Sequence, residues 1–430
     1  MRHLTTLCSL LGTLATPALA SLQIVPGGTW TASNGEHLNA HGAGVIKVNN
    51  TFYLIGEDKA GGSAFANVNC YSSTDLVQWK YEGALLSRTA SGDLGPNRII
   101  ERPKVIYNDK TGKYVLWMHV DSSNYGDAKV GVATGDSVCG KYNYIRSFRP
   151  LGFESRDMGL FKDDDGTAYL LTEDRANGVR INKLTADYLD VAAATYLWKD
   201  RIESPALVKV KGRYYMFGSH LTGWDPNDNV YSSSASLTSG WSAWTTFADA
   251  KSNTYASQTT YILDYGDGNI MYMGDRWVSK NLQASTYIWL PLSFSSDNKA
   301  TMKNRASWVP SAGLATPWTA APEQTSYDGV KGAYSGAAKD VSCAKCAGGK
   351  AAGYIGGSDD GKLTISGIRS DRDGVSTVQI RYASGDTNPR YAAVAVNGGA
   401  PVKVAFHSTG GDTGTSEVNV ALRKGGIMWW

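Results

Sequence analysis

The sequence predicts an all-β protein, in which a five-bladed β-propeller is followed by a small, jelly-roll-like β-sandwich. Three observations lead to this fold class. A strand–turn–strand pattern occurs five times, its repeats are separated by 46 to 61 residues, and the composition changes after residue 325. A repeat of about 50 residues built only from short strands is typical of a propeller with one blade per repeat.

Each repeat begins with a polar residue that opens an apolar strand, and a central tyrosine follows in the next strand 12 to 14 residues later. The five openers are His41, Glu101, Asp157, Glu203 and Gln258. The five tyrosines are Tyr53, Tyr114, Tyr169, Tyr215 and Tyr272. Turn pairs such as Asn49-Asn50 and Asp165-Gly166 separate the two strands, and such pairs close tight hairpins. Because the first strand of each blade lines the axis, we expect the openers to converge on one axial pocket.

The remaining segments follow from composition. Arg2 and His3 precede an apolar run over 4–15, and Ala18-Leu19-Ala20 is a small-x-small cleavage site, so residues 1–20 read as a secretory signal. We therefore expect a secreted, extracellular protein. The propeller is expected over 21–309, a proline-containing linker over 310–325 and the sandwich over 326–430.

Charge and hydropathy exclude several classes of partner. The net charge is +3 with scattered Lys and Arg, which gives no electrostatic basis for binding nucleic acid. No apolar run is long enough for a membrane span. The chain has 48 Gly, 24 Tyr and only 19% charged residues, as expected for a turn-rich secreted β protein, and we expect a monomer.

Four cysteines remain after the signal. Cys343 and Cys346 are close in one domain and are expected to pair, which leaves Cys70 and Cys139 as the second disulfide. A redox or zinc site is the alternative for Cys343-Ala-Lys-Cys346, but no second Cys pair or His cluster accompanies it. Asn49 begins the one N-glycosylation sequon, in a predicted surface turn.

The three axial carboxylates suit the hydrolysis of a glycosidic bond. That reaction needs one carboxylic acid to protonate the leaving oxygen and a second group to activate water. Glu203 is the expected acid, because Pro205 restrains the backbone after it and a neighbouring Asp157 would raise its pKa by like-charge repulsion. The alternative is a structural role at the start of a blade. Arg102, which flanks Glu101, reads as a surface or ion-pair residue.

These residues carry a family resemblance. The segments Glu101-Arg102-Pro103, Arg156-Asp157-Met158-Gly159, Glu203-Ser204-Pro205-Ala206 and Asp165-Gly166-Thr167-Ala168-Tyr169 resemble glycoside hydrolase family 43, whose members are five-bladed propellers that invert anomeric configuration. His41-Gly42-Ala43-Gly44 and Ser257-Gln258-Thr259-Thr260 resemble its exo-β-1,3-galactanase (galactan 1,3-β-galactosidase) subgroup.

The resemblance implies a role for each axial residue. Glu203 matches the general acid, Asp157 the carboxylate that tunes and orients it, and Glu101 an acid that contacts the substrate. Most members place an aspartate as general base in the first blade, where this chain has Asn39-Ala40-His41-Gly42. Gln258 matches the glutamine that holds the water, as an amide or as an imidic-acid tautomer. Glu101 and His41 are the alternative bases.

Sugar pockets also need flat apolar faces and polar groups for hydroxyls. Tyr125, Trp224 and Trp277 follow axial strands and are candidates for stacking on a galactose ring. Glu57, Thr222 and Asn229 are candidates for hydroxyl contacts.

The C-terminal segment resembles carbohydrate-binding module family 35. The motifs are Ser335-Gly336-Ala337, Cys343-Ala-Lys-Cys346, Gly353-Tyr354-Ile355-Gly356-Gly357 and Val396-Asn397-Gly398-Gly399. The resemblance implies a sugar-binding sandwich with calcium as a candidate cofactor. The family continues past Gly425-Gly426 into a last strand, so we expect this sandwich to lack that strand.

Together these features predict a secreted, inverting exo-β-1,3-galactanase that releases galactose from the β-1,3-galactan chains of arabinogalactan and needs no cofactor for catalysis. The alternatives are an arabinofuranosidase or β-xylosidase of the same family, or a non-catalytic sugar-binding propeller.

Overall fold

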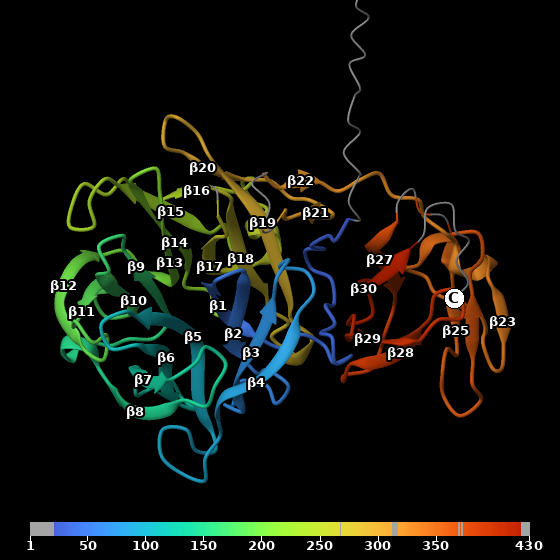
Figure 1. Cartoon of the computed structure of the whole chain (residues 1–430), viewed down its shortest axis with the longest axis horizontal. Coiled ribbons are helices and arrows are strands. Elements are labelled where there is room, and N and C mark those ends of the chain that lie inside the picture. Colours follow the sequence, from blue (N-terminus) through green and yellow to red (C-terminus); the bar gives the residue numbers. More distant parts are fainter. Residues whose placement is uncertain (1–20, 267, 312–316, 369, 371–372, 423–430) are drawn as a thin grey trace, which may run out of the picture.

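A computed structural model describes residues 21–266, 268–311, 317–368, 370 and 373–422. The predicted signal over 1–20 and the predicted loss of a strand after residue 426 therefore lie outside the described residues. The regular elements of the described chain are almost all β-strands, which form five four-stranded sheets and a set of smaller C-terminal sheets (Figure 1). The predicted fold class is confirmed.

The five larger sheets are the blades, and each consists of four consecutive antiparallel strands. Blade 1 consists of β1 (His41–Val48), β2 (Thr51–Glu57), β3 (Asn67–Ser73) and β4 (Lys80–Ser87). Blade 2 consists of β5 (Arg98–Asn108), β6 (Lys113–Ser122), β7 (Lys129–Gly135) and β8 (Asn143–Phe148). Blade 3 consists of β9 (Met158–Lys162), β10 (Ala168–Asp174), β11 (Gly178–Leu184) and β12 (Val191–Trp198). Blade 4 consists of β13 (Ile202–Val210), β14 (Arg213–His220), β15 (Val230–Ser234) and β16 (Thr245–Thr246). Blade 5 consists of β17 (Gln258–Asp264), β18 (Ile270–Arg276), β19 (Thr286–Phe294) and β20 (Ala300–Met302).

The first strands of the blades form the inner ring. β1, β5, β9, β13 and β17 contact one another in this order, and β17 returns to β1, which closes the propeller. Each predicted tyrosine lies in the second strand of its blade. Large side chains fill the space between the blades, and Phe52, Trp117, Tyr272 and Trp289 are fully buried there.

A β-bulge interrupts four of the five inner strands close to the predicted opener. The register shifts between His41 and Gly44, Glu101 and Lys104, Glu203 and Ala206, and Thr259 and Tyr261. In three blades the residue after the opener has a positive φ; these residues are Gly42, Arg102 and Ser204. A Cβ atom on Gly42 would lie 2.0 Å from Glu57 Oε1, so only glycine fits there. Because a bulge re-aims the side chains beside it, the openers turn toward the axis.

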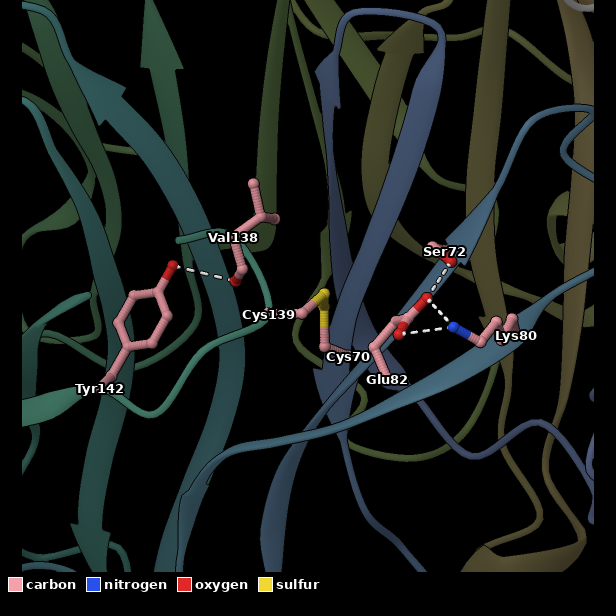
Figure 2. The surroundings of a disulfide bond; sticks show 7 residues. All are labelled: Cys70, Ser72, Lys80, Glu82, Val138, Cys139 and Tyr142. Carbon is pink, nitrogen blue, oxygen red and sulfur yellow. Dashed lines mark hydrogen bonds and ion pairs between the residues drawn. A yellow bond between two sulfur atoms is a disulfide. The ribbon is translucent and has the colours of Figure 1, made fainter. Parts of the chain in front are cut away.

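Both predicted disulfides are present. Cys70 of β3 is joined to Cys139, which lies between β7 and β8, so this bond ties blade 1 to blade 2 (Figure 2). Beside it, Tyr142 donates a hydrogen bond to the Val138 carbonyl, which closes the turn that presents Cys139. Cys343 is joined to Cys346 in the C-terminal module.

The C-terminal module contains four strand pairs. They are β23 (Ala333–Ser335) with β26 (Lys362–Thr364), β24 (Lys339–Ser342) with β25 (Lys350–Gly353), β27 (Gly374–Tyr382) with β30 (Gly414–Leu422), and β28 (Arg390–Val394) with β29 (Val402–Phe406). A valine-rich core with buried Val404, Val418 and Val420 packs between the last four strands.

Part of the predicted linker pairs with the propeller. β22 (Thr319–Ala320) pairs with β21 (Trp308–Val309), and the Trp318 ring packs against Trp308 and Arg305. The connection is therefore anchored to the propeller at both sides of the undescribed residues 312–316.

An N-terminal arm, residues 21–37, runs between the propeller and the module, where Figure 1 draws it in blue beside the red strands. Ile24 pairs with Trp308 of the propeller. The Thr29 amide donates to the Thr415 carbonyl, and the Ala405 amide donates to the Thr31 hydroxyl. The arm thus contributes hydrogen bonds to both domains.

Candidate active site

Four of the five openers gather around one buried guanidinium at the axis. Arg102 Nε lies 2.9 Å from Asp157 Oδ2, and its Nη2 donates to Gln258 Oε1 at 2.7 Å and to the Ser204 hydroxyl at 2.6 Å. Arg102 thus connects residues from blades 2, 3, 4 and 5. Of the two interpretations of Arg102, the ion pair is confirmed and the surface position is wrong, because only 4% of this residue is exposed.

The hydrogen bonds of Gln258 fix the orientation of its amide. Arg102 Nη2 and the Trp277 indole, which lies 2.9 Å from Oε1, are both donors, so the atom between them is the acceptor Oε1. The amide nitrogen therefore faces Glu203 Oε1 at 2.9 Å and the Ser219 hydroxyl at 3.2 Å. An Oε1 that accepts from two donors has no room for a proton, so the resting side chain is the amide rather than the imidic-acid tautomer.

Glu203 lies in an environment that keeps its carboxyl protonated. Burial and the nearby charges of Asp157 and Glu173 raise its pKa to about 9, against the lowering effect of Arg102 and Arg175. Asp157, Glu173 and Glu203 each place one carboxylate oxygen within 4.8 Å of the other two. Since Oε1 accepts from Gln258, the proton of Glu203 lies on Oε2.

Glu101 has the opposite electrostatic environment. Burial alone would raise its pKa, but the Lys59 ammonium, 3.7 Å away, and the His119 and Tyr125 side chains lower this pKa to about 2. His119 lies between Glu101 and Asp121, and these two carboxylates raise its pKa to about 9 despite burial. Glu101 is therefore a fixed negative charge at the pocket.

His41, the fifth opener, is held in place by the fifth blade. Its Nδ1 lies 2.9 Å from Asp275 Oδ1, and its ring stacks on Tyr287 with centroids 4.7 Å apart. Asp275 also accepts from the Gly42 amide and the Thr260 hydroxyl. This arrangement matches a positioned structural histidine better than a base.

The predicted aromatic walls lie on the loops that follow the second strand of each blade. The Tyr125 hydroxyl donates to Glu101 at 2.9 Å. The Trp277 and Trp224 rings meet edge to face with centroids 4.8 Å apart, and Lys59 lies over Trp224. An open cleft of about 320 Å³ continues outward from Trp224 between loops at 60–63 and 279–283.

The three candidates for hydroxyl contacts are occupied by protein partners. Glu57 is buried, accepts from the Arg102 amide at 2.7 Å and forms an ion pair with Lys59. The Thr222 hydroxyl bonds within its own loop, to the Asp225 carbonyl. Asn229 Oδ1 accepts from both the amide and the hydroxyl of Thr259. Of these, Glu57 and Asn229 bind the backbone amides of Arg102 and Thr259, which lie next to the openers Glu101 and Gln258.

A left-handed turn precedes Gln258. All four residues of the short α1 segment (Asn253–Ala256) have φ between 51° and 58°. L-residues resist this conformation, at a cost of about 1–2 kcal/mol each. The turn is held because the buried Thr254 hydroxyl bonds Asn227 and Asn229, while the Asn253 amide donates to Asp228. It places Ser257 and Gln258 at the axis.

Four further residues of the site were not predicted from the sequence: Lys59, His119, Glu173 and Arg175. All four lie at the axial ends of second strands or in the loops that follow them. A position at or after the end of a predicted Tyr-centred strand is the signal that could have found them. The same signal predicted the aromatic residues.

The described part of the C-terminal module offers no calcium ligand set. Groups of three or more close ligand-type side chains in the described residues lie only in the propeller, as Glu101 with His119 and Asp157, and as Asp157 with Glu173 and Glu203. In the module, Asp328 caps the Val330 amide, while Asp340 accepts from Tyr334 and pairs with Lys350. Calcium there stays a prediction. No helix in the described ranges is long and apolar enough to cross a membrane.

A closed propeller with buried acids at its axis defines the class of a glycoside hydrolase. The family model described as glycosyl hydrolases family 43 matches residues 39–280, and the chain belongs to this family.

Among solved structures, an exo-β-1,3-galactanase from Phanerochaete chrysosporium is 39% identical, with 95% of each chain covered and a TM-score of 0.70. It was solved with galactose and, as substituted variants, with β-1,3-galactotriose. An exo-β-1,3-galactanase from Clostridium thermocellum is 28% identical, with 92% of this chain and 100% of the other covered and a TM-score of 0.66. No curated protein sequence matches this chain.

The assignment of the C-terminal module to family 35 is wrong. Residues 362–428 match the family model described as the CBM13 domain of alpha-galactosidase. Most of the motifs behind the earlier assignment lie between residues 335 and 357, before this match begins. They are short, glycine-rich turns, and motifs of this length did not distinguish one module family from another.

Proposed function

We propose that this protein is a secreted, inverting exo-β-1,3-galactanase that releases galactose from β-1,3-galactan. The observation that carries the proposal is the environment of Glu203. Burial and the charge of Asp157 keep its carboxyl protonated, and its Oε1 accepts a hydrogen bond from the Gln258 amide. The 39% identity to the Phanerochaete chrysosporium enzyme over 95% of both chains supports galactan as the substrate.

In the proposed reaction, Glu203 donates its Oε2 proton to the glycosidic oxygen as the bond to the anomeric carbon breaks. A water on the opposite face attacks that carbon and releases its proton to solvent as the new C–O bond forms. Single displacement of this kind inverts the configuration and gives α-galactose.

The electrostatics divide the remaining roles. A carboxylate with a pKa of about 2 is a weak base, so we assign to Glu101 the stabilisation of positive charge on the sugar ring. We assign the holding of water to Gln258, whose Oε1 is fixed by Arg102 and Trp277 and whose Nε2 would exchange its 3.2 Å bond with the Ser219 hydroxyl for one to the water. The Trp277 and Trp224 rings are assigned to the apolar face of galactose.

The test is incubation with linear β-1,3-galactan, with the products followed by proton NMR from the first minutes. Early α-galactose as the only small product is expected. Release of arabinose or xylose from their polymers instead would transfer the assignment to the other activities of the family. Glu203→Gln should lower the rate at least ~100-fold. Asp165→Asn, on an exposed hairpin of blade 3, serves as the matched control.

Secretion is part of the proposal. The predicted signal precedes the described chain, and Asn49 lies exposed at the turn between β1 and β2, where a glycan has space. Expression in a secreting host should give protein that begins at Ser21 and loses mass on treatment with an N-glycan-releasing enzyme. Asn49→Gln should abolish that mass change. We also propose that the protein acts as a monomer and that its module binds sugar.

A further inference from the structure

Arg175 and Glu173 form a pair that the reaction described so far leaves unused. Arg175 lies in the loop after β10, on the same face of the propeller as Tyr125 and Trp277. Its side chain is 46% exposed, whereas that of Glu173 is 2% exposed. An arginine that reaches from a buried acid to the surface of a catalytic pocket is available to a ligand.

The position of Glu173 is fixed by the backbone. Glu173 lies opposite Asp157, because its amide donates to the Asp157 carbonyl and its carbonyl accepts from the Arg156 amide. Its Oε1 accepts from Arg175 Nε at 2.7 Å. Glu173 therefore holds the guanidinium at a set distance from the axis.

The guanidinium points its remaining donors toward the acid. Arg175 Nη2 lies 3.9 Å from Glu203 Oε2, too far for a hydrogen bond. Within the described part of the chain, neither terminal nitrogen of Arg175 makes a hydrogen bond. Both nitrogens thus remain available beside the oxygen that carries the proton.

The position of that proton places the leaving sugar. Gln258 occupies Glu203 Oε1, so the glycosidic oxygen must approach Oε2 to within about 3 Å. The sugar that leaves is attached to this oxygen and therefore lies within reach of Arg175. A planar fork of N–H donors suits two neighbouring hydroxyl oxygens.

We propose that Arg175 binds hydroxyl groups of the leaving galactose unit and that Glu173 is the positioning residue that holds Arg175. This inference rests on the proposed function and extends it to the sugar on the leaving side of the scissile bond. It predicts that Arg175 distinguishes a disaccharide from a monosaccharide in binding, independently of any turnover.

The test uses the full-length chain with Glu203→Gln, so that no ligand is consumed. Calorimetric titrations with galactose and with β-1,3-galactobiose give the affinity that the second sugar adds. Adding Arg175→Ala should weaken galactobiose binding about tenfold or more and leave galactose binding unchanged. Arg175→Lys should recover part of the loss, and Glu173→Gln should show a smaller loss. Arg213→Ala, in the hairpin at the opposite end of blade 4, is the matched control.

The outcomes separate this inference from the proposed function. If wild-type protein releases no galactose from galactan, the proposed function fails. If it does release galactose, but Arg175→Ala leaves galactobiose affinity unchanged or weakens both sugars equally, the inference on Arg175 is overturned. An Arg175 that serves only as a counter-ion to Glu203 would produce one of the last two results.

Discussion

Replacing Asp157 by asparagine should move the alkaline limit of activity to lower pH. The carboxylates of Asp157 and Glu203 lie within 4.8 Å of each other, and Asp157 is the largest charge that raises the pKa of Glu203 after burial. Two unit charges about 5 Å apart repel by about 3 kcal/mol at an effective dielectric constant of about 20. That energy corresponds to about two pH units.

The sign follows from the role of Glu203 as an acid. Activity needs the protonated carboxyl, which persists up to a pKa of about 9 in the wild type. Without the neighbouring negative charge, the pKa falls to about 7. The ion pair between Asp157 and Arg102 is lost as well, and the freed guanidinium acts in the same direction. At pH 8 the protonated fraction should therefore fall from about nine-tenths to about one-tenth.

The assay is kcat/KM for β-1,3-galactobiose between pH 4 and pH 10. A shift of the alkaline limb of this pH profile to lower pH by about two pH units supports the reasoning. A uniform loss at every pH, with the limb in place, would refute it, because Asp157 would then act by orientation alone. Asp165→Asn, on an exposed hairpin, should leave the profile unchanged.

Three further predictions concern stability. Ala256→Gly removes one left-handed L-residue from the turn before Gln258 and should stabilise the fold by about 0.5–1 kcal/mol in urea melts, whereas destabilisation would show that the turn is unstrained. Burial lowers the pKa of His37 to about 4 and that of His407 to about 3, so stability should be lost as pH falls from 6.5 toward 4, by about 3 kcal/mol for the first histidine. Comparing urea midpoints at pH 7 and pH 4.5 tests this, and His407→Phe should flatten the dependence. Replacing Cys70 and Cys139 by serine opens a link across 69 residues and should cost about 4 kcal/mol, whereas an unchanged midpoint would contradict that loop-entropy argument.

The blade pattern could be predicted from the sequence because each blade begins with an apolar inner strand and a turn, and a tyrosine follows in the second strand at a nearly fixed offset. These are local signals, and the tight hairpins preserve them in the fold. The convergence of Glu101, Asp157, Glu203 and Gln258 followed from ring closure, which needs only the number of blades and the order of strands within each.

The electrostatics of the site could be predicted less well from the sequence. The acidic pKa of Glu101 depends on Lys59 and His119, which approach it from other strands, and nothing near Glu101 in sequence signals them. For Arg102 the sequence left a surface position and an ion pair open, because the bulge that buries it is set by backbone geometry. The sequence also does not show that the Thr222 hydroxyl bonds within its own loop, and a sugar contact of Thr222 stays a prediction.

The N-terminal arm links the order of synthesis to the order of folding. The hydrogen bonds that Thr29 and Thr31 make with the module have partners between residues 382 and 417. The first segment of the described chain to leave the ribosome must therefore wait for nearly the last one. During that interval the propeller has all of its blade strands, while the apolar and polar groups of the arm face solvent. Slow emergence of the module should leave this nascent state open to chaperones until the arm docks.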